Sequence, residues 1–325
     1  MRVIIYGAGG IGSVLGGHLA RTGHEVVLIG RPGHVKAINK KGLRLVTPTG
    51  THIVRLPAVT SPDEINFGPD DVVFLSMKSQ NTEEALSDLM AITNLVPIFC
   101  FQNGVRNEEV VAEHFPMVYG VMVRIGAVYL NDGEVIARRD PPGWLVMGCY
   151  PQGTDELVQA VAEELRAASF LVMVTPDVMP YKWGKLMDNL GNAIGAITNA
   201  RGGDNALIIR AAQQELRDLL AQADIHWVSA EEVAKQLPEA AQPLRGRLDT
   251  EAQSSTWQSL ARGTGTIETE FLNGEVVRLA KKLGSQAPVN EKLLRISQEM
   301  SAKREPPGKY TPAQLRKLVG LSESR

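Results

Sequence analysis

The stretch "RVIIYGAGGIGSVLGGHLAR", Arg2–Arg21, determines the expected fold of the N-terminal half. An apolar, β-branched run, Arg2–Tyr6, leads directly into the glycines of "GAGGIG", Gly7–Gly12, and a helical pattern follows over Ile11–Arg21. The glycines have the GxGxxG spacing in the strand-to-helix context that this motif requires. The pattern is typical of the first strand and helix of a dinucleotide-binding α/β fold.

Each residue of this turn has an expected role. Gly7 permits the tight turn, Gly9 lets the backbone approach a pyrophosphate, and Gly12 allows the helix to pack closely on the strand. Gly10 and Ile11 complete the turn, whose amides and positive helix end are expected to hold the diphosphate. The alternative is a purely structural glycine turn.

The alternation of strands and helices continues beyond this turn. Buried-strand patterns are predicted over Glu25–Gly30, Asp71–Ser76, Val96–Phe101 and Leu171–Thr175, with a helix over Glu83–Leu95 and a hairpin turn at "NDG", Asn131–Gly133. After about Pro176 the patterns become helical. We therefore expect an α/β dinucleotide-binding domain over residues 1–175 and a helical substrate and catalytic domain over 176–325.

Composition limits the classes of partner. The chain has 325 residues, 44% of them hydrophobic, and a formal net charge of −2, which gives no broad attraction for nucleic acid or anionic membranes. Cys100 and Cys149 lack metal-site spacing and are expected to be reduced core thiols. No signal-peptide pattern and no run of ~20 apolar residues is present. A cytoplasmic protein that binds small molecules, without a metal, is expected.

The second strand indicates which dinucleotide binds. It is followed by Arg31 instead of the Asp or Glu that accepts hydrogen bonds from a ribose 2′-hydroxyl, so a 2′-phosphate and NADP(H) are favoured. Lys78 and "QNG", Gln102–Gly104, place further polar groups at the carboxyl ends of later strands, where ligands bind in such folds. The alternatives are a chance arginine, a solvated lysine and a plain turn.

The stretch "KWGKLMDNLGNAIGAITNA", Lys182–Ala200, predicts a helix with an apolar stripe that includes Met187 and Ile194. The opposite side gathers four polar residues, Lys185, Asn189, Asn192 and Asn199. Asparagine is a poor helix former, so this polar row is either a tolerated solvated face or a row that faces a ligand.

A carboxylate accompanies the apolar side of a later helical pattern. Within Gly263–Gly284, Glu268 lies four residues before Leu272 and falls on the apolar side. It is either an acid in a first helical turn, stabilised by the helix dipole, or a partner for a lysine in an active site. A lysine and a glutamate beside a nicotinamide would form an acid and an orienting group for a carbonyl.

Together these motifs resemble the ketopantoate reductase (2-dehydropantoate 2-reductase) family across nearly the whole chain. The matching elements, in order, are "GAGGIG", Arg31, "MK" ending at Lys78, "QNG" with Asn103, "KWGKLMDN" with Lys185 and Asn189, and "IETEFLNG" with Glu268 and Asn273. The resemblance implies an N-terminal Rossmann domain, a C-terminal all-helical domain like that of 6-phosphogluconate dehydrogenase, and an active site in a cleft between them. It also implies NADPH as reductant and a branched 2-keto acid as substrate.

The resemblance also implies residue roles. Lys185 matches the general acid that protonates the carbonyl oxygen, and Glu268 matches the group that hydrogen-bonds the substrate hydroxyl. Asn189 matches a substrate contact and Asn103 the asparagine near the nicotinamide. Arg31 and Lys78 match the cations at the 2′-phosphate.

The chain departs from the family pattern at two places. The second helix asparagine, eight residues after the lysine, is Ala193 here, with Asn192 beside it. The Pro-Ser-Met turn appears as "SSTWQS", in which Thr256 is the closest match to the carboxylate-binding serine, Ser255 its neighbour, and Trp257 replaces a smaller residue.

Two alternative functions therefore stay open. The chain reduces a different 2-keto acid or related carbonyl, or it is a non-catalytic NADP(H)-binding sensor. A homodimer is also compatible with the sequence.

Overall fold

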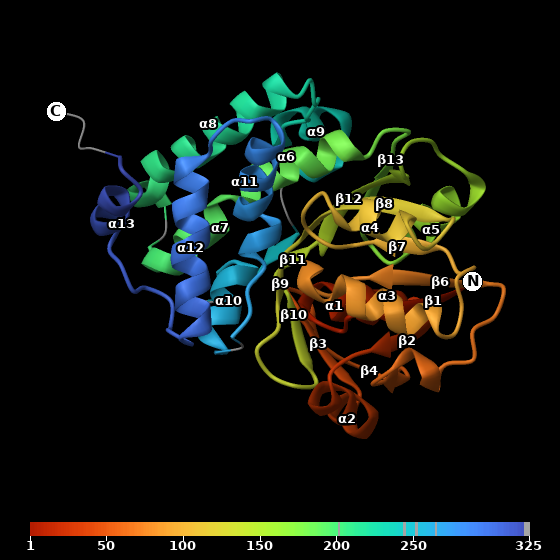
Figure 1. Ribbon diagram of the computed structural model, residues 1–325. Coiled ribbons are helices and arrows are strands. Elements are labelled where there is room, and N and C mark those ends of the chain that lie inside the picture. The colour runs from red at the N-terminus through yellow and green to blue at the C-terminus, as the bar shows by residue number, and fades with distance from the viewer. Residues whose placement is uncertain (201, 243–244, 251–252, 264, 322–325) are drawn as a thin grey trace. The chain divides into compact units, whose positions relative to one another are not determined.

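The computed structural model describes residues 1–325 except 201, 243–244, 251–252, 264 and 322–325. The chain forms two compact units (Figure 1). Unit 1 consists of Met1–Lys182 with Ser229–Asp249, and unit 2 of Trp183–Val228 with Thr250–Arg325. The expected boundary lay near Pro176; unit 1 continues to Lys182 and takes in a segment from the helical half of the sequence.

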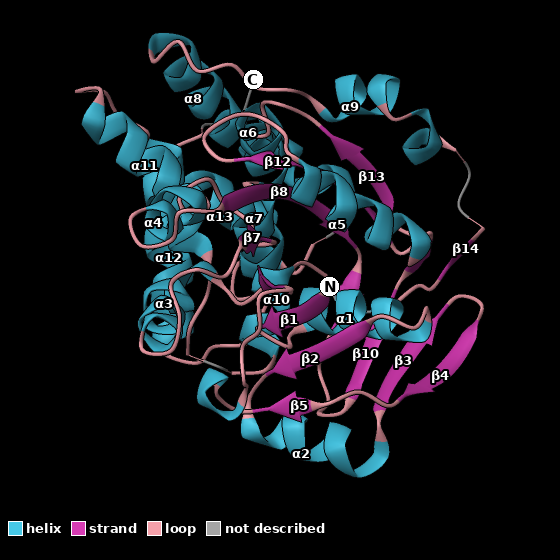
Figure 2. Cartoon of the chain, turned by 90° about the vertical axis from the view of Figure 1, so that its right-hand side faces the viewer, coloured by secondary structure: helices cyan, strands magenta, loops and turns pink. Residues whose placement is uncertain are grey.

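Unit 1 is built on a twisted eight-stranded sheet. In sheet order, its strands are β13 (Leu171–Val174), β12 (Gly143–Cys149), β8 (Val118–Ile125), β7 (Ile98–Cys100), β6 (Asp71–Leu75), β1 (Arg2–Tyr6), β2 (Glu25–Ile29) and β5 (Ala58–Val59). All neighbouring pairs are parallel except β8 with β12. Figure 2 shows β1, β2 and β5 running in the same direction.

Alternate residues of β1 reach two separate cores. Val3 and Ile5 pack in one core with α1 (Gly10–Arg21) and α5 (Glu156–Ala167). Ile4 packs in the other, with leucines of α3 (Thr82–Met90) and Val111 of α4 (Asn107–Ala112). Because successive side chains of a strand point to opposite faces, a strand that is apolar throughout needs cover on both faces. The predicted doubly wound α/β arrangement is therefore confirmed.

The remaining elements of unit 1 surround this sheet. A four-stranded sheet has the order β4 (Gly50–Val54), β3 (Leu43–Thr47), β10 (Glu134–Ala137) and β9 (Ala127–Val128), and β11 (Arg139–Asp140) pairs with β14 (Gly246–Arg247). The helical elements are α2 (Pro32–Lys41), η1 (Pro62–Glu64), η2 (Ser79–Asn81), α9 (Ala230–Gln236) and η4 (Pro238–Ala241). The sequence did not predict β3, β4 or β14, and the helix predicted to reach Leu95 ends at Met90.

Unit 2 consists of helices over its described residues. The division between the units falls within α6 (Met179–Asn189), and the further elements are α7 (Gly191–Thr198), η3 (Gly202–Asn205), α8 (Ala206–Gln222), α10 (Ser255–Ala261), η5 (Thr269–Phe271), α11 (Asn273–Lys282), α12 (Pro288–Ala302) and α13 (Pro312–Leu318). Leu190 interrupts the helix that was predicted to run from Lys182 to Ala200. This all-helical unit was predicted.

The C-terminal segment closes the end of α7. The amide of Gly308 donates to the carbonyl oxygen of Ala196 at 3.1 Å, and that of Tyr310 donates to Ile197 at 3.2 Å. Since the last carbonyls of a helix have no intrahelical donor, these two bonds satisfy groups that α7 cannot satisfy itself. Among the residues that the structure describes, no helix is both long and apolar enough to span a membrane.

Candidate functional site

The glycine turn lies between β1 and α1. Gly7 has φ +108°, and a Cβ there would lie 2.7 Å from the Cα of Met77, so only glycine fits. A Cβ on Gly12 would lie 2.8 Å from Ile5 Cγ2, which reflects the close approach of α1 to β1. At Gly9, by contrast, an added Cβ would meet the Gly7 carbonyl oxygen at 3.9 Å, and among the described residues outside its chain neighbours no other atom lies within 4 Å. This leaves room for a ligand to approach the backbone.

The amino end of α1 is electrostatically exposed. Gly9 is the N-cap residue, no side chain caps the helix, and its first turn contains no acidic residue. The first N–H groups of a helix, here beginning with Gly10 and Ile11, lack intrahelical acceptors and carry partial positive charge. This helix end is suited to an anion such as a diphosphate.

The two predicted cations follow the strands on either side of β1. Arg31 is the exposed N-cap residue of α2, just after β2, and Lys78 is a half-buried residue just after β6. The chain passes from β1 to β2 on one side and later to β6 on the other, so the carboxyl end of β1 is the topological switch point of the sheet. Ser76 Oγ donates to the Gly7 carbonyl oxygen at 2.9 Å, which joins the segment before Lys78 to the glycine turn.

A buried polar network positions the loop of Asn103. The Asn103 carbonyl oxygen accepts from Asn107 Nδ2 at 2.9 Å and from Ser79 Oγ at 3.3 Å. Gln102 Nε2 donates to Thr82 Oγ1 at 2.7 Å, and Thr82 donates to Asn107 Oδ1 at 3.1 Å. The network fixes the segment after Lys78 against the "QNG" loop. Sequence reasoning missed Asn107 and Thr82, whose polar side chains at helix starts gave the only signal.

A buried ion pair lies beneath this loop. Lys182 Nζ pairs with Glu108 Oε1 and donates to the Gln102 carbonyl oxygen at 3.2 Å, and both charged side chains are at most 2% exposed. Burial raises the pKa of Glu108, while Lys182 pulls it down. Burial also raises the pKa of the neighbouring Cys100 thiol. Lys182, where the predicted helix began, is thus a core residue of unit 1.

In unit 2, α6 carries Lys185 and Asn189 one turn apart. Lys185 is half-buried, whereas Asn189 is only 6% exposed. A buried asparagine does not fit the solvated-face alternative. Gly184, beside Lys185, lies against the backbone of Val228: an added Cβ would be 2.9 Å from the Val228 carbonyl carbon and closer still to its oxygen. This contact holds α6 at a fixed distance from the segment after α8.

The half-buried Asn192 lies beside the start of α10. Ser254 Oγ, the cap of α10, donates to the Asn192 carbonyl oxygen at 3.3 Å. Ser255, half-buried, and Thr256, 1% exposed, are the first two residues of this helix. Within the described part of the chain, Thr256 Oγ1 has no hydrogen-bond partner. A buried hydroxyl without a partner is costly unless a ligand or water satisfies it.

Asn199 has a different role from the other members of the predicted polar row. It has φ +53° and is the left-handed C-cap of α7. Its Oδ1 accepts from Trp257 Nε1 at 2.8 Å. Asparagine tolerates this conformation better than most residues, so its position here has a structural reason.

Glu268 lies before the helix that was predicted to contain it. It is the N-cap residue of η5 and only 4% exposed, and α11 starts at Asn273. Its burial agrees with its predicted place on the apolar side, but the first turn of α11 does not contain Glu268. Asn273 Nδ2 donates to the Leu190 carbonyl oxygen at 3.4 Å, directly after Asn189. The motif of Glu268 therefore contacts the end of α6.

The site residues named from the sequence thus fall into two sets. Unit 1 brings together the glycine turn, Lys78 and the loop of Asn103, with Arg31 on the neighbouring strand end. Unit 2 brings the end of α6 against the start of α11, and the start of α7 against the start of α10. Among the described residues, no group of His, Cys, Asp or Glu side chains is arranged to hold a metal ion.

Comparison with known proteins assigns the chain to a family. Residues 3–152 match the family described as "Ketopantoate reductase PanE/ApbA", and residues 177–301 match "Ketopantoate reductase PanE/ApbA C terminal". The chain belongs to the ketopantoate reductase family. The 2-dehydropantoate 2-reductase of Pyrococcus horikoshii is 33% identical over 298 residues, which cover 89% of this chain and 94% of that protein.

Solved structures of the ketopantoate reductase family show the same fold. The PanE/ApbA family ketopantoate reductase of Ralstonia eutropha JMP134 is 29% identical with a TM-score of 0.76, covering 94% of this chain and 99% of that one. The ternary structure of D-mandelate dehydrogenase with NADH and anilino(oxo)acetate has a TM-score of 0.80 at 21% identity, over 94% of this chain and 99% of that one, a likeness in fold alone.

Proposed function

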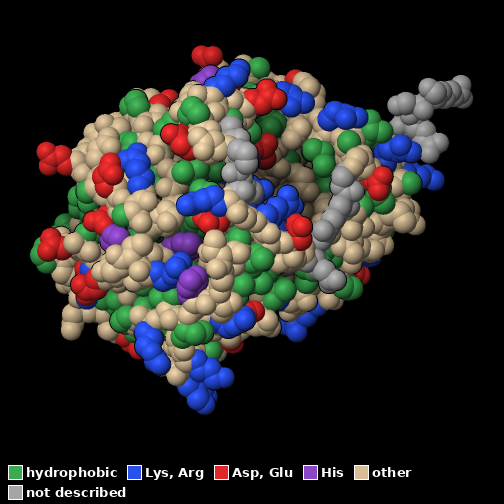
Figure 3. Space-filling model, turned by 180° about the vertical axis from the view of Figure 1, so that it is seen from behind, with side chains coloured by type: hydrophobic (Ala, Val, Ile, Leu, Met, Phe, Trp, Pro, Cys, Tyr) green, Lys and Arg blue, Asp and Glu red, His purple; other side chains and the backbone are tan. Residues whose placement is uncertain are grey.

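We propose that this chain is an NADPH-dependent reductase of a 2-keto acid, and that 2-dehydropantoate is its substrate, reduced to pantoate. Relatives that span most of the chain carry the name 2-dehydropantoate 2-reductase. Figure 3 shows basic and acidic side chains spread over the same face of the molecule. With a net charge of −2, this distribution is in keeping with a small-molecule substrate.

The residues of unit 1 fit a dinucleotide. The uncapped start of α1 and the free space beside Gly9 suit a diphosphate. Arg31 offers a guanidinium to a 2′-phosphate, and Lys78 offers a second cation from the far side of β1. Asn103 would lie toward the nicotinamide. These features support NADP(H) over NAD(H).

The residues of unit 2 supply the proton and hold the substrate. When bound, NADPH would supply the hydride that adds to C2 of the keto acid. Lys185 Nζ donates a proton to the carbonyl oxygen, so that the carbonyl becomes a hydroxyl, and solvent returns the proton to the amine. Glu268 accepts a hydrogen bond from that hydroxyl, and Asn189, Asn192 and the start of α10 hold the rest of the substrate.

The observation that carries this proposal is the hydrogen bond between Asn273 and Leu190. It joins the motif of Glu268 to the end of the helix that carries Lys185 and Asn189, 83 residues away in sequence. This long-range contact places the two polar motifs side by side in unit 2, which supports a shared site.

A second candidate substrate class is another 2-keto acid. Ala193 is a buried residue where the family has an asparagine, and Trp257 donates to Asn199. Both differences alter the surroundings of Asn192 and Thr256. A pocket changed in this way favours a substrate whose side chain differs from that of ketopantoate.

Steady-state kinetics of NADPH oxidation with ketopantoate, pyruvate, 2-ketoisovalerate and phenylglyoxylate test the proposal, with NADH run in parallel. We expect the highest kcat/KM for ketopantoate with NADPH. Turnover of ketopantoate no better than that of pyruvate would contradict the substrate assignment. Binding of NADPH without turnover of any keto acid would contradict the enzyme assignment and favour a sensor.

A further inference from the structure

The loop that joins β9 to β10, residues 129–133, starts beside the cofactor turn of unit 1 and extends to α2 (Figure 1). A Cβ added to Gly10 would be 3.2 Å from the Cβ of Ala127 and 3.8 Å from that of Tyr129. The segment leading into the loop therefore packs directly on the start of α1. The turn predicted at "NDG" forms its far end, where β10 pairs with β9 in antiparallel fashion.

The loop brings a carboxylate to the start of α2. A Cβ added to Gly33 would be 3.2 Å from Cγ of Asp132 and closer still to its Oδ2. Gly33 is two residues after Arg31, so their Cα atoms are at most about 7.6 Å apart. An acidic side chain thus lies at the first turn of α2, the helix whose N-cap residue is the cation proposed to bind the 2′-phosphate. In many NAD-binding folds an acidic residue at the end of the second strand contacts the ribose 2′-hydroxyl. Asp132 instead comes from the loop between β9 and β10.

Buried contacts fix this loop in place. The Gly133 amide donates to His34 Nδ1 at 2.8 Å, so the Nε2 of the neutral imidazole carries the proton and donates to Ser13 Oγ at 3.2 Å. Burial lowers the pKa of His34, while Asp132 pulls it up. The neutral histidine therefore links the loop to α1, directly after Gly12. Asp132 itself is held by the Tyr129 hydroxyl, which donates to its Oδ1 at 2.9 Å.

We propose that Asp132 is a specificity-determining residue for the ribose 2′ group of the cofactor. Its carboxylate opposes the charge of a 2′-phosphate bound at Arg31 and accepts a hydrogen bond from a 2′-hydroxyl. Arg31 and Asp132 together can therefore contact either group, and the site binds NADH in addition to NADPH but more weakly. This inference rests on the dinucleotide site of the proposed function and is independent of the substrate.

Titration of NADPH and NADH fluorescence tests the inference without any substrate. Asp132→Asn keeps the shape of the side chain and removes its charge. We expect the ratio of NADPH to NADH affinity to rise about five- to tenfold, since one unit charge a few ångströms away changes binding by about that factor in a solvated site. The matched control is Asp70→Asn. Asp70 is exposed and lies at the amino end of β6, whereas the cofactor turn lies at the carboxyl ends of the strands, so this variant should leave the affinity ratio unchanged.

Salt dependence separates a charge effect from a change of shape. The ratio of NADPH to NADH affinity should differ less between the original chain and Asp132→Asn as NaCl rises from about 0.05 M to about 0.5 M, because screening weakens charge interactions. An unchanged ratio in Asp132→Asn overturns the inference, as does a difference that salt does not reduce. If the original chain binds both dinucleotides, these results leave the proposed function intact. If it binds neither, the cofactor assignment fails together with the inference.

Discussion

The Cα of Gly184 faces the carbonyl group of Val228 so closely that an added Cβ would lie 2.9 Å from the carbonyl carbon. No side chain larger than hydrogen fits between α6 and this backbone. Gly184 directly precedes Lys185, so the position of the proposed acid depends on a glycine.

Gly184→Ala should therefore destabilise the protein. Overpacking against a backbone carbonyl costs about 1–3 kcal/mol or more, because neither partner can rotate away. A lower Tm in circular dichroism would show this. Gly203→Ala is the control, since a Cβ there meets no atom of the described residues within 4 Å and should leave Tm nearly unchanged. Equal Tm values for the two variants would mean that α6 is not held by this contact.

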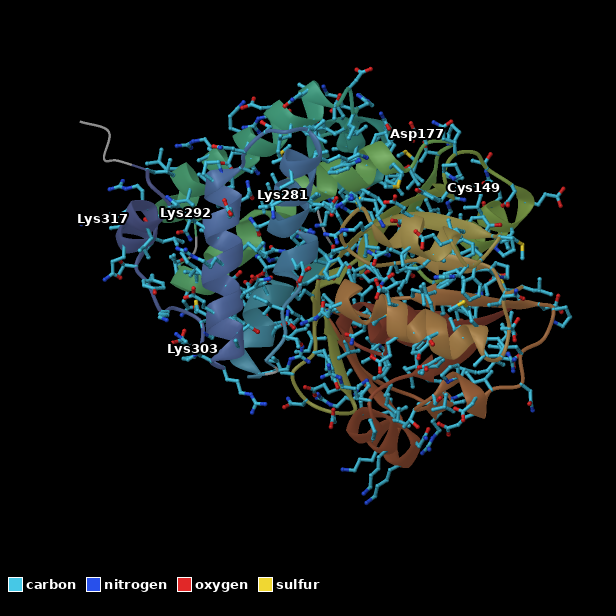
Figure 4. The ribbon with its side chains drawn as sticks, in the orientation of Figure 1. Cys149, Asp177, Lys281, Lys292, Lys303 and Lys317 are labelled. Carbon is cyan, nitrogen blue, oxygen red and sulfur yellow. The ribbon has the colours of Figure 1, made fainter. Side chains whose placement is uncertain are left out.

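Lys185→Ala should reduce kcat by about 10²–10⁴-fold, the range typical of a lost general acid, with little change in NADPH affinity. Stopped-flow or steady-state turnover, with a separate NADPH titration, measures both quantities. Lys281→Ala on α11 (Figure 4) is the matched control, since Lys281 is exposed, and it should retain full turnover. Undiminished turnover of Lys185→Ala would remove this lysine from the chemistry.

Arg31→Ala should weaken NADPH binding by about tenfold or more and leave NADH binding nearly unchanged, because a hydrogen bond to a charged group contributes about 1.5–3 kcal/mol. Fluorescence titration of both dinucleotides gives the two dissociation constants. The exposed Arg55 provides the control variant Arg55→Ala. A parallel loss of NADH and NADPH affinity would place Arg31 away from the 2′-phosphate.

His18 should make the protein less stable in weak acid. Its side chain is 8% exposed, lies edge-on to Phe170, and burial lowers its pKa to about 4. Because the folded pKa is below that of the unfolded chain, the unfolded state binds more protons between about pH 6.5 and pH 4, so stability falls as pH falls through this window. Between pH 7.5 and pH 5, protonation of His18 in the unfolded state should lower the free energy of unfolding by about 2 kcal/mol.

Urea unfolding at these two pH values measures this loss. His18→Gln should reduce the pH dependence of the free energy of unfolding. The control is His226→Gln, at an exposed histidine, and it should retain this dependence. If both variants keep the same dependence, another group is responsible.

The central strands and the cofactor turn could be predicted from sequence because their signals are local. Arg2–Tyr6 is apolar on both faces and ends in spaced glycines, and each feature is visible within a few residues. The hairpin of β3 and β4 gave a weaker signal, since β3 alternates buried and less buried positions over only five residues and β4 is buried only at Val54. The pairing of β3 with β10 joins it to a segment some 90 residues away.

The polar contacts of the candidate site were less predictable. Lys182 and Glu108 each resemble an ordinary surface residue, and only the fold brings them together across 74 residues. Asn199 has the spacing of the polar row, yet its left-handed backbone ends α7. Periodicity reports which side a residue faces in an ideal helix, but it does not report where the helix stops.

The donors that Gly308 and Tyr310 provide to α7 come from residues far along the chain. Proteolytic trimming that removed this stretch would expose the final carbonyls of α7 and loosen Asn199, with its bond to Trp257. Loss of the tail would thereby disturb Trp257, which is next to Thr256, although no residue of the tail needs to contact a substrate.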